Sequence, residues 1–331
     1  MSDKTPVTGQ DIQVRGISVE KRLHFLKLRW VAFALSGLII AGGIVAFFTT
    51  GGFKLGIDFL GGARVEMQIA SEDADLISLR EMLLEEWADS EVTTIGALEE
   101  KNFLITITGE EGASTNDIAM IESKVAERFG VENIEVRGST LVGPKMGEAF
   151  ARRALILVLI VAGMILAYVA LRFDFFYGAG AIIAVFHDIL IMLTFCLVLD
   201  IRIDIAIIAA LLTILGYSIN DTIVVFDRVR ENHKLNPDED YEYTMDKSIG
   251  QSLSRTIITS VTTLLVAIAI AIWGGSVLRN FGIMLIIGVL SGTYSSIFTA
   301  SPVTFTLKKL LDKKIKLGDK EGKKKLKGQK A

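Results

Sequence analysis

The sequence predicts a polytopic α-helical membrane protein with six transmembrane helices and one α+β domain between the first two. An apolar composition, six long apolar segments and one intervening polar stretch lead to this prediction. The 331 residues are 51% hydrophobic with a mean hydropathy of +0.48, which is more apolar than ordinary soluble chains. The one cysteine, Cys196, lies inside an apolar segment, so disulfide or zinc chemistry is not expected.

A helix needs roughly 20 consecutive apolar residues to cross the hydrocarbon core of a bilayer. A spanning segment must be helical because lipid offers no partners for backbone amides and carbonyls. We therefore expect the first span at 30–49 and five more within 151–307, with a cytoplasmic loop at about 228–252. The six segments that meet the length requirement are Trp30–Thr49, Ala154–Leu171, Phe175–Leu199, Ile205–Phe226, Thr256–Gly274 and Phe281–Leu307.

Basic residues at the two ends of the chain predict its orientation. Four Lys and Arg residues lie within 21–29, before the first apolar segment, and eleven lysines lie between Lys308 and Lys330. Loops rich in Lys and Arg stay in the cytoplasm. Segment 1–29 and tail 308–331 are therefore both expected on the cytoplasmic side of the cytoplasmic membrane. The tail either only sets this topology or also binds anionic lipid or ribosomal RNA.

Residues 50–150 are expected to form an extracytoplasmic (periplasmic) domain with the order βαββαβ, which is typical of a ferredoxin-like sheet with helices on one face. Nineteen acidic residues outnumber eight basic ones between Gly52 and Met146, so this domain is not expected to bind nucleic acid. The acidic surface serves either solubility or contact with extended polypeptide. Apolar periodicity places the elements at Ala63–Ala70, Ala74–Ala88, Val92–Leu98, Phe103–Thr108, Asn116–Phe129 (with Ser114 or Thr115 as its cap) and Ile134–Val142.

Asp221 is the leading candidate for a functional residue. It lies in the fourth apolar segment, where an ionisable side chain costs at least about 2.5 to 3.5 kcal/mol at mid-helix. Asp221 either couples ion movement or is a neutralised structural residue. Helical spacing places it on one face with Thr213, Tyr217 and Asn220.

Arg255 is the candidate cation for Asp221. It borders a polar stripe on the fifth apolar segment and is expected at a depth similar to that of Asp221. Arg255 is either the partner of the carboxylate or a snorkelling interfacial arginine. The stripe comprises Ser252, Thr256, Thr259 and Thr263.

Three further polar residues are secondary candidates, together with Asn220. His187 and Asp188 in the third segment are either a hydrogen-bonded packing pair or a proton relay. Asp58 lies in GIDFLGG, where paired glycines favour a tight turn at the membrane exit. Alternatively, Asp58 contacts a partner or a permeating ion.

Motifs for nucleotide binding, metalloprotease chemistry, a serine nucleophile and paired-cysteine metal sites do not occur in the sequence. We therefore predict a transport protein rather than an enzyme, with no catalytic residues, no cofactor and no metal site. Its coupling ion is expected to be H⁺, with Na⁺ as the alternative.

Several strings resemble the SecF family of protein-export membrane subunits, which belongs with SecD to the resistance-nodulation-division superfamily. They cover nearly the whole chain in the family's order. The strings are GIDFLGGARVEM, LVGPKMGEAF, AVFHDILI, GYSINDTIVVFDRVREN and SLSRTIITSVTTLL.

The resemblance implies a SecD partner, association with the SecYEG translocon, a translocating unfolded polypeptide as substrate, and surrounding membrane lipid. It also implies that Asp221 and Arg255 are the pair associated with proton movement. Protonation of Asp221 is then expected to weaken its attraction to Arg255 and move the extracytoplasmic domain late in export. A small-molecule or lipid exporter half of the same superfamily and a non-catalytic translocon scaffold remain alternatives.

Overall fold

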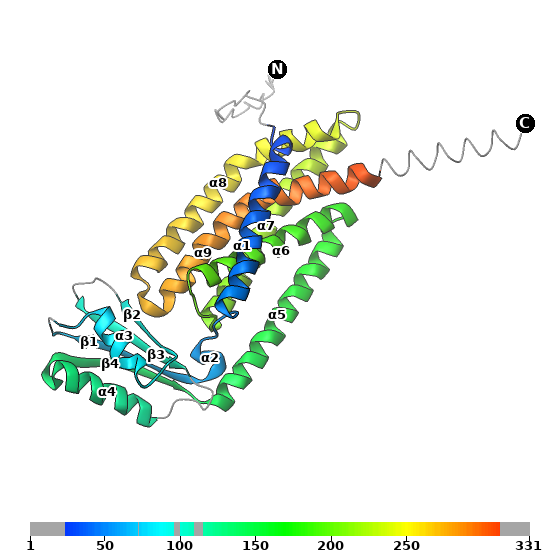
Figure 1. Cartoon of the computed structure of the whole chain (residues 1–331). Coiled ribbons are helices and arrows are strands. Elements are labelled where there is room, and N and C mark those ends of the chain that lie inside the picture. Colours follow the sequence, from blue (N-terminus) through cyan, green and yellow to red (C-terminus); the bar gives the residue numbers. More distant parts are fainter. Residues whose placement is uncertain (1–23, 72, 96–99, 109–114, 312–331) are drawn as a thin grey trace, which may run out of the picture.

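The structure is a computed structural model that describes residues 24–71, 73–95, 100–108 and 115–311 (Figure 1). Most of the predicted amino-terminal segment and of the lysine-rich tail lies outside these ranges. Within them, six helices are long and apolar enough to cross a membrane. The long helices are α1 (Arg29–Thr50), α5 (Pro144–Arg172), α6 (Phe175–Val198), α7 (Ile205–Leu235), α8 (Tyr241–Trp273) and α9 (Gly275–Ser295).

Several helices extend beyond the apolar segments that predicted them. A 3₁₀ turn, η1 (Leu26–Leu28), precedes α1, and α9 continues through a π-helical turn, η4 (Ser296–Ala300), into a helix at 301–311. Helices α7 and α8 also cover most of the expected loop at 228–252, so that residues 236–240 alone connect them. Charged side chains do not end these helices because they remain solvated past the apolar region.

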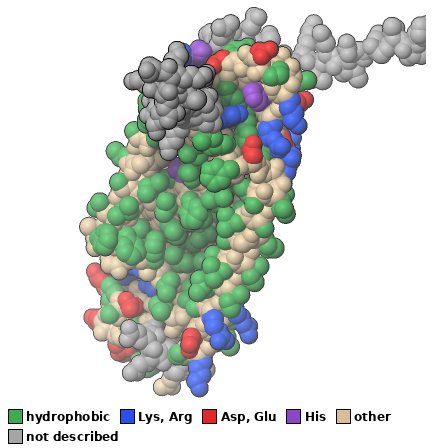
Figure 2. Space-filling model, turned by 90° about the vertical axis from the view of Figure 1, so that its right-hand side faces the viewer, with side chains coloured by type: hydrophobic (Ala, Val, Ile, Leu, Met, Phe, Trp, Pro, Cys, Tyr) green, Lys and Arg blue, Asp and Glu red, His purple; other side chains and the backbone are tan. Residues whose placement is uncertain are grey.

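The surface of the helical bundle is apolar. Hydrophobic side chains cover its middle, and charged side chains gather toward both ends of the molecule (Figure 2). On α1, Leu38 is 73% exposed and Phe48 is 77% exposed. An apolar face of this kind fits contact with lipid rather than with water.

Small residues allow α9 to pack closely against its neighbours. A Cβ atom at Gly288 would lie 2.3 Å from Cγ1 of Ile214 on α7. A Cβ atom at Gly282 would lie 2.6 Å from the backbone nitrogen of Ala271 on α8. Close helix contact in membranes relies on such small residues because lipid supplies no hydrophobic driving force between helices.

The polar stretch forms a four-stranded antiparallel sheet with the strand order β2-β3-β1-β4. The predicted order of strands and helices is confirmed, although the strand expected at 92–98 ends at Ile95 and residues 96–98 lie outside the described ranges. Apolar residues of β1, β2 and β3 pack against α3 and α4 to form the core of this domain. Its elements are β1 (Gly62–Ile69), α3 (Leu76–Leu84), β2 (Ser90–Ile95), β3 (Asn102–Thr108), α4 (Thr115–Phe129) and β4 (Ile134–Val142).

The glycine-rich segment after α1 forms a short helix, α2 (Ile57–Leu60), followed by two glycines with positive φ. At Gly62, where φ is +151°, a Cβ atom would lie 2.2 Å from the carbonyl oxygen of Ile107 on β3. Before α2, the amide of Gly56 donates to the carbonyl of Ile203 at 2.8 Å. The paired glycines thus let the chain turn sharply from α1 into the sheet while it contacts the α6–α7 connection.

Candidate functional site

The structure places Asp221 inside the bundle, on α7. Its side chain is 3% exposed, and within the described residues its Oδ2 atom has no hydrogen-bond partner. Arg255 on α8 is the charged group that acts electrostatically on this carboxylate. The two side chains form no ion pair within 4.0 Å, and Arg255 is exposed. The predicted pair is therefore within electrostatic range but not in contact.

The predicted polar stripe on α7 is divided between two environments. Tyr217 points toward α8 and donates to Ser260 Oγ at 2.9 Å, whereas Thr213 and Asn220 are exposed on the outer surface. Asn220 is therefore not part of a buried site with Asp221.

The stripe on α8 includes a residue that sequence reasoning had not singled out. Ser260 hydrogen-bonds with Thr293 of α9 at 2.6 Å and accepts from Tyr217, so it connects three helices. Thr256 is 1% exposed, and its hydroxyl has no hydrogen-bond partner within the described residues. Buried polar atoms without hydrogen bonds thus occur on both helices that carry the candidate pair: within the described residues, these are Asp221 Oδ2, Thr222 Oγ1 and His233 Nδ1 on α7, and Thr256 Oγ1 on α8.

Asp188 on α6 lies at the centre of a buried polar cluster, which we call the Asp188 cluster. Its side chain is 1% exposed. Ser218 of α7 donates to Oδ2 at 2.5 Å, and Ser295 of α9 donates to the same oxygen at 2.7 Å. Ser291 of α9 donates to Oδ1 at 2.6 Å. Hydroxyl groups from two other helices, α7 and α9, therefore supply hydrogen bonds to both oxygens of the Asp188 carboxylate.

His187 extends this cluster to α1. Its Nδ1 lies 3.0 Å from Asp188 Oδ1, and its Nε2 lies 2.9 Å from Ser36 Oγ. Ser36 donates to the hydroxyl of Tyr294 on α9, at 3.2 Å. The structure therefore brings together two predicted secondary candidates and joins them to serines that the sequence analysis did not identify. The signal in the sequence was the spacing of Ser291 and Ser295 on one helix face.

Asp58 belongs to a different part of the molecule. Its Oδ2 accepts from the amide of Ile205, so it contributes to the start of α7. Asp204 accepts from Ile207 in the same helical turn. Since Asp221 lies sixteen residues after Ile205, about 24 Å along the helix, Asp58 is not near the Asp221 carboxylate.

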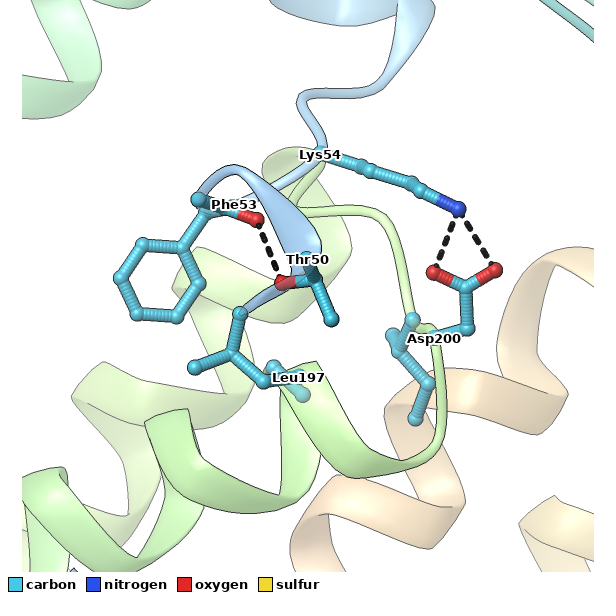
Figure 3. Close-up of a pocket in the computed structure, with 8 residues that line it drawn as sticks. Thr50, Phe53, Lys54, Leu197 and Asp200 are labelled. Carbon is cyan, nitrogen blue, oxygen red and sulfur yellow. Dashed lines mark hydrogen bonds and ion pairs between the residues drawn. The ribbon is translucent and has the colours of Figure 1, made fainter. Parts of the chain in front are cut away.

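Two ion pairs connect the α6–α7 loop to the segments around the sheet. Arg202 donates from Nε to Glu91 of β2 at 2.6 Å and from a terminal nitrogen to Thr108 of β3 at 3.0 Å. Lys54 contacts both carboxylate oxygens of Asp200 at 2.7 Å, beside a small pocket at the end of α1 (Figure 3). The Lys54 pair is more exposed than the Arg202 pair.

A bundle of six long apolar helices with a small attached domain is the architecture of a multi-pass membrane protein. Comparison with known proteins identifies it further. The family described as "Protein export membrane protein SecD/SecF, C-terminal" matches residues 121–310, and the "SecD/SecF GG Motif" matches residues 46–71.

Curated relatives named protein translocase subunit SecF match most of the chain. The relative from Thermodesulfovibrio yellowstonii is 39% identical over 303 residues, which are 90% of this chain and 98% of the relative. The relative from Haemophilus influenzae is 38% identical and covers 88% of this chain and 89% of its own length. The chain belongs to the SecF family, and it is a membrane component of protein export.

A solved structure supports the same assignment. The crystal structure of SecDF from Thermus thermophilus, a translocon-associated membrane protein, matches with a TM-score of 0.76 and 37% identity. The match covers 88% of this chain but 39% of that chain. The chain described here therefore corresponds to about two fifths of the longer SecDF protein.

Proposed function

We propose that this chain works with a SecD partner to couple cation movement through the membrane to a late stage of polypeptide export. The observation that carries this proposal is the carboxylate of Asp221, which is buried in an apolar bundle with one oxygen free of hydrogen bonds. Arg255 is close enough to attract it electrostatically but does not neutralise it by contact. A carboxylate in this setting is suited to bind and release a proton or Na⁺.

Binding a cation at Asp221 changes its attraction to Arg255 and so favours a different arrangement of α7 and α8. A proton that crosses the membrane potential supplies roughly 2.3 kcal/mol per 100 mV, which is enough to shift a two-state helix arrangement. The connection between α6 and α7 contacts the sheet, so a shift of α7 reaches the domain through this loop. The domain would thereby alternate between holding and releasing an extended polypeptide.

The finer features of the architecture belong to the same proposal. The order of elements and the strand order β2-β3-β1-β4 support a ferredoxin-like domain. The basic residues near both ends of the chain support cytoplasmic termini in the cytoplasmic membrane, with the sheet on the opposite side. Membership of the SecF family supports association with SecYEG and a role in transport rather than catalysis.

Replacement of Asp221 by Asn tests the proposal. Asp221→Asn removes the charge with little change in shape, and we expect proton-dependent export from membrane vesicles to be lost while the protein still accumulates and binds SecD. Asp227→Asn is the matched control, because Asp227 is also on α7 but pairs with Arg172 near the helix end. Unchanged export in Asp221→Asn would contradict the proposal.

The same vesicles separate the remaining alternatives. Proton and sodium gradients imposed one at a time identify the coupling ion. A non-catalytic scaffold predicts that Asp221→Asn and Arg255→Gln both retain full export as long as the complex assembles. A small-molecule or lipid exporter predicts that polypeptide export is insensitive to both gradients.

A further inference from the structure

The Asp188 cluster is separate from the carboxylate on which the proposed function depends. Three serine hydroxyls and one histidine ring surround Asp188. Within the described residues, no Lys or Arg forms an ion pair with Asp188; its one charge partner is His187. The other titratable side chain in this network is Tyr294, which stacks beside His187. The donors and acceptors can therefore be assigned one bond at a time.

The assignment begins at α1, where a backbone carbonyl can only accept. Tyr294 donates its hydroxyl proton to the carbonyl of Ala32 at 2.8 Å. Ser36 then has to donate to Tyr294, because the tyrosine proton is already used. The proton of Ser36 is likewise used, so the contact between Ser36 and His187 requires Nε2 of the histidine to be the donor.

This result determines what lies between His187 and Asp188. A neutral imidazole protonated on Nε2 has a lone pair on Nδ1. That nitrogen lies 3.0 Å from Asp188 Oδ1, and two lone pairs facing each other at this distance repel. One more proton must therefore lie between Nδ1 and Oδ1, either on the ring or on the carboxyl group.

We propose that the His187–Asp188 pair is a second intramembrane proton-binding site. The pair carries one more proton than a neutral histidine and an ionised aspartate would carry together. The pair then has a formal net charge of zero in either arrangement of the proton. Neutrality explains how a carboxylate that is 1% exposed lies at this depth without a guanidinium or ammonium partner. The serine hydroxyls suit both states of Asp188 because each hydroxyl can donate or accept.

Release of this proton changes the contact between α1 and α9. When Nε2 gives its proton to a water molecule, the proton between Nδ1 and Oδ1 is left on Nδ1, whichever of the two atoms carried it before, and it continues to bond Asp188, which is then ionised. Ser36 must then turn its own proton toward Nε2, and it loses its hydrogen bond to Tyr294. Helix α1 leads directly into the glycine segment and the sheet (Figure 1). Protonation of the pair is thereby transmitted to the helix that carries the domain.

This inference deepens the proposed function, because Ser218 of the Asp188 cluster lies three residues before Asp221 on α7. The experiment, however, does not depend on export. The full chain is labelled with ¹⁵N-histidine and embedded in lipid nanodiscs, and nuclear magnetic resonance reports which ring nitrogens carry protons. The chain has three histidines, and the signal that disappears in His187→Gln belongs to His187.

We expect Nε2 of His187 to be protonated at neutral pH. We also expect either a protonated Nδ1 or an infrared band of a protonated carboxyl group that Asp188→Asn removes. Ser36→Ala should shift the histidine proton to Nδ1 alone, whereas Ser36→Thr, which keeps the hydroxyl, should leave the spectrum unchanged. A wild-type ring protonated on Nδ1 alone, with no infrared band lost in Asp188→Asn, would overturn the proposal. A Ser36→Ala spectrum identical to wild type would overturn the connection to α1. If Asp221→Asn did not affect export, the proposed function would be wrong, but these spectra would still be as expected. The failure of one proposal can therefore be distinguished from the failure of the other.

Discussion

Replacement of Arg202 tests how firmly the sheet is attached to the bundle. Arg202 lies in the loop between α6 and α7 and donates to Glu91, to Thr108 and, at 3.3 Å, to the carbonyl of Asp89. Its side chain is 17% exposed and that of Glu91 is 29% exposed. Arg202→Gln and Glu91→Gln remove the charges one at a time, and the double variant completes a thermodynamic cycle.

The size of the coupling follows from burial. A hydrogen bond to a charged group contributes about 1.5 to 3 kcal/mol. The remaining exposure of both side chains weakens it, so we expect a coupling of about 1 to 2 kcal/mol, a factor of roughly 5 to 30 in the equilibrium for detachment of the domain. Lys54 and Asp200 provide a matched comparison, since their side chains are 49% and 67% exposed. Their coupling should be about 0 to 1 kcal/mol.

Amide hydrogen exchange measures both couplings. The amide of Ile203 donates to the carbonyl of Lys54, and the amide of Gly56 donates to the carbonyl of Ile203. Both hydrogen bonds are lost when the α6–α7 loop separates from the domain side, so the exchange rates of these two amides report the detachment equilibrium. Added salt should abolish the coupling of the exposed Lys54 pair first. A coupling between Arg202 and Glu91 no larger than that between Lys54 and Asp200 would refute the conclusion that Arg202 anchors the domain.

Two further predictions concern packing and pH. Gly282→Ala places a methyl group against the backbone of Ala271, which cannot rotate away, so thermal unfolding should show a loss of about 1 to 3 kcal/mol. Gly37→Ala, with open space at its Cβ position, should show no loss. Burial raises the pKa of Asp204 above its ordinary value, and the nearby Asp58 carboxylate adds to the rise. The folded state then binds the proton more tightly than the unfolded state, so stability should fall as pH rises between the unfolded and folded pKa values. Asp204→Asn should remove that slope in unfolding measured against pH, and a slope that persists would show that another group is responsible.

The positions of the helices were predictable because lipid imposes a strict rule on any spanning segment. Twenty or so apolar residues must form a helix, so hydropathy alone located all six. Alternating apolar residues located β1 for a similar reason, since one of its faces is buried in the core. This rule does not extend to every strand, because β3 is buried along its whole length and β4 is mostly exposed. The ends of α7 and α8 were less predictable. Charged residues mark the limit of the membrane, but they do not stop a helix that continues into water.

For the candidate residues, too, some properties were predictable from the sequence and others were not. An aspartate in an apolar segment is conspicuous in any sequence, so Asp221 and Asp188 were found without coordinates. The sequence did not show which of the two carboxylates is hydrogen-bonded, because hydrogen bonds between helices depend on which helix faces meet. Gly288 and Gly292 permit close packing of α9 against α7, and Ser291 and Ser295 of α9 donate to Asp188. Asp221, in contrast, has an oxygen without a hydrogen bond within the described residues. Local sequence thus determined which segments span the membrane and which charges they carry. Tertiary packing decided the remaining partners: His187 is the sequence neighbour of Asp188, but the three serines that donate to Asp188 come from α7 and α9.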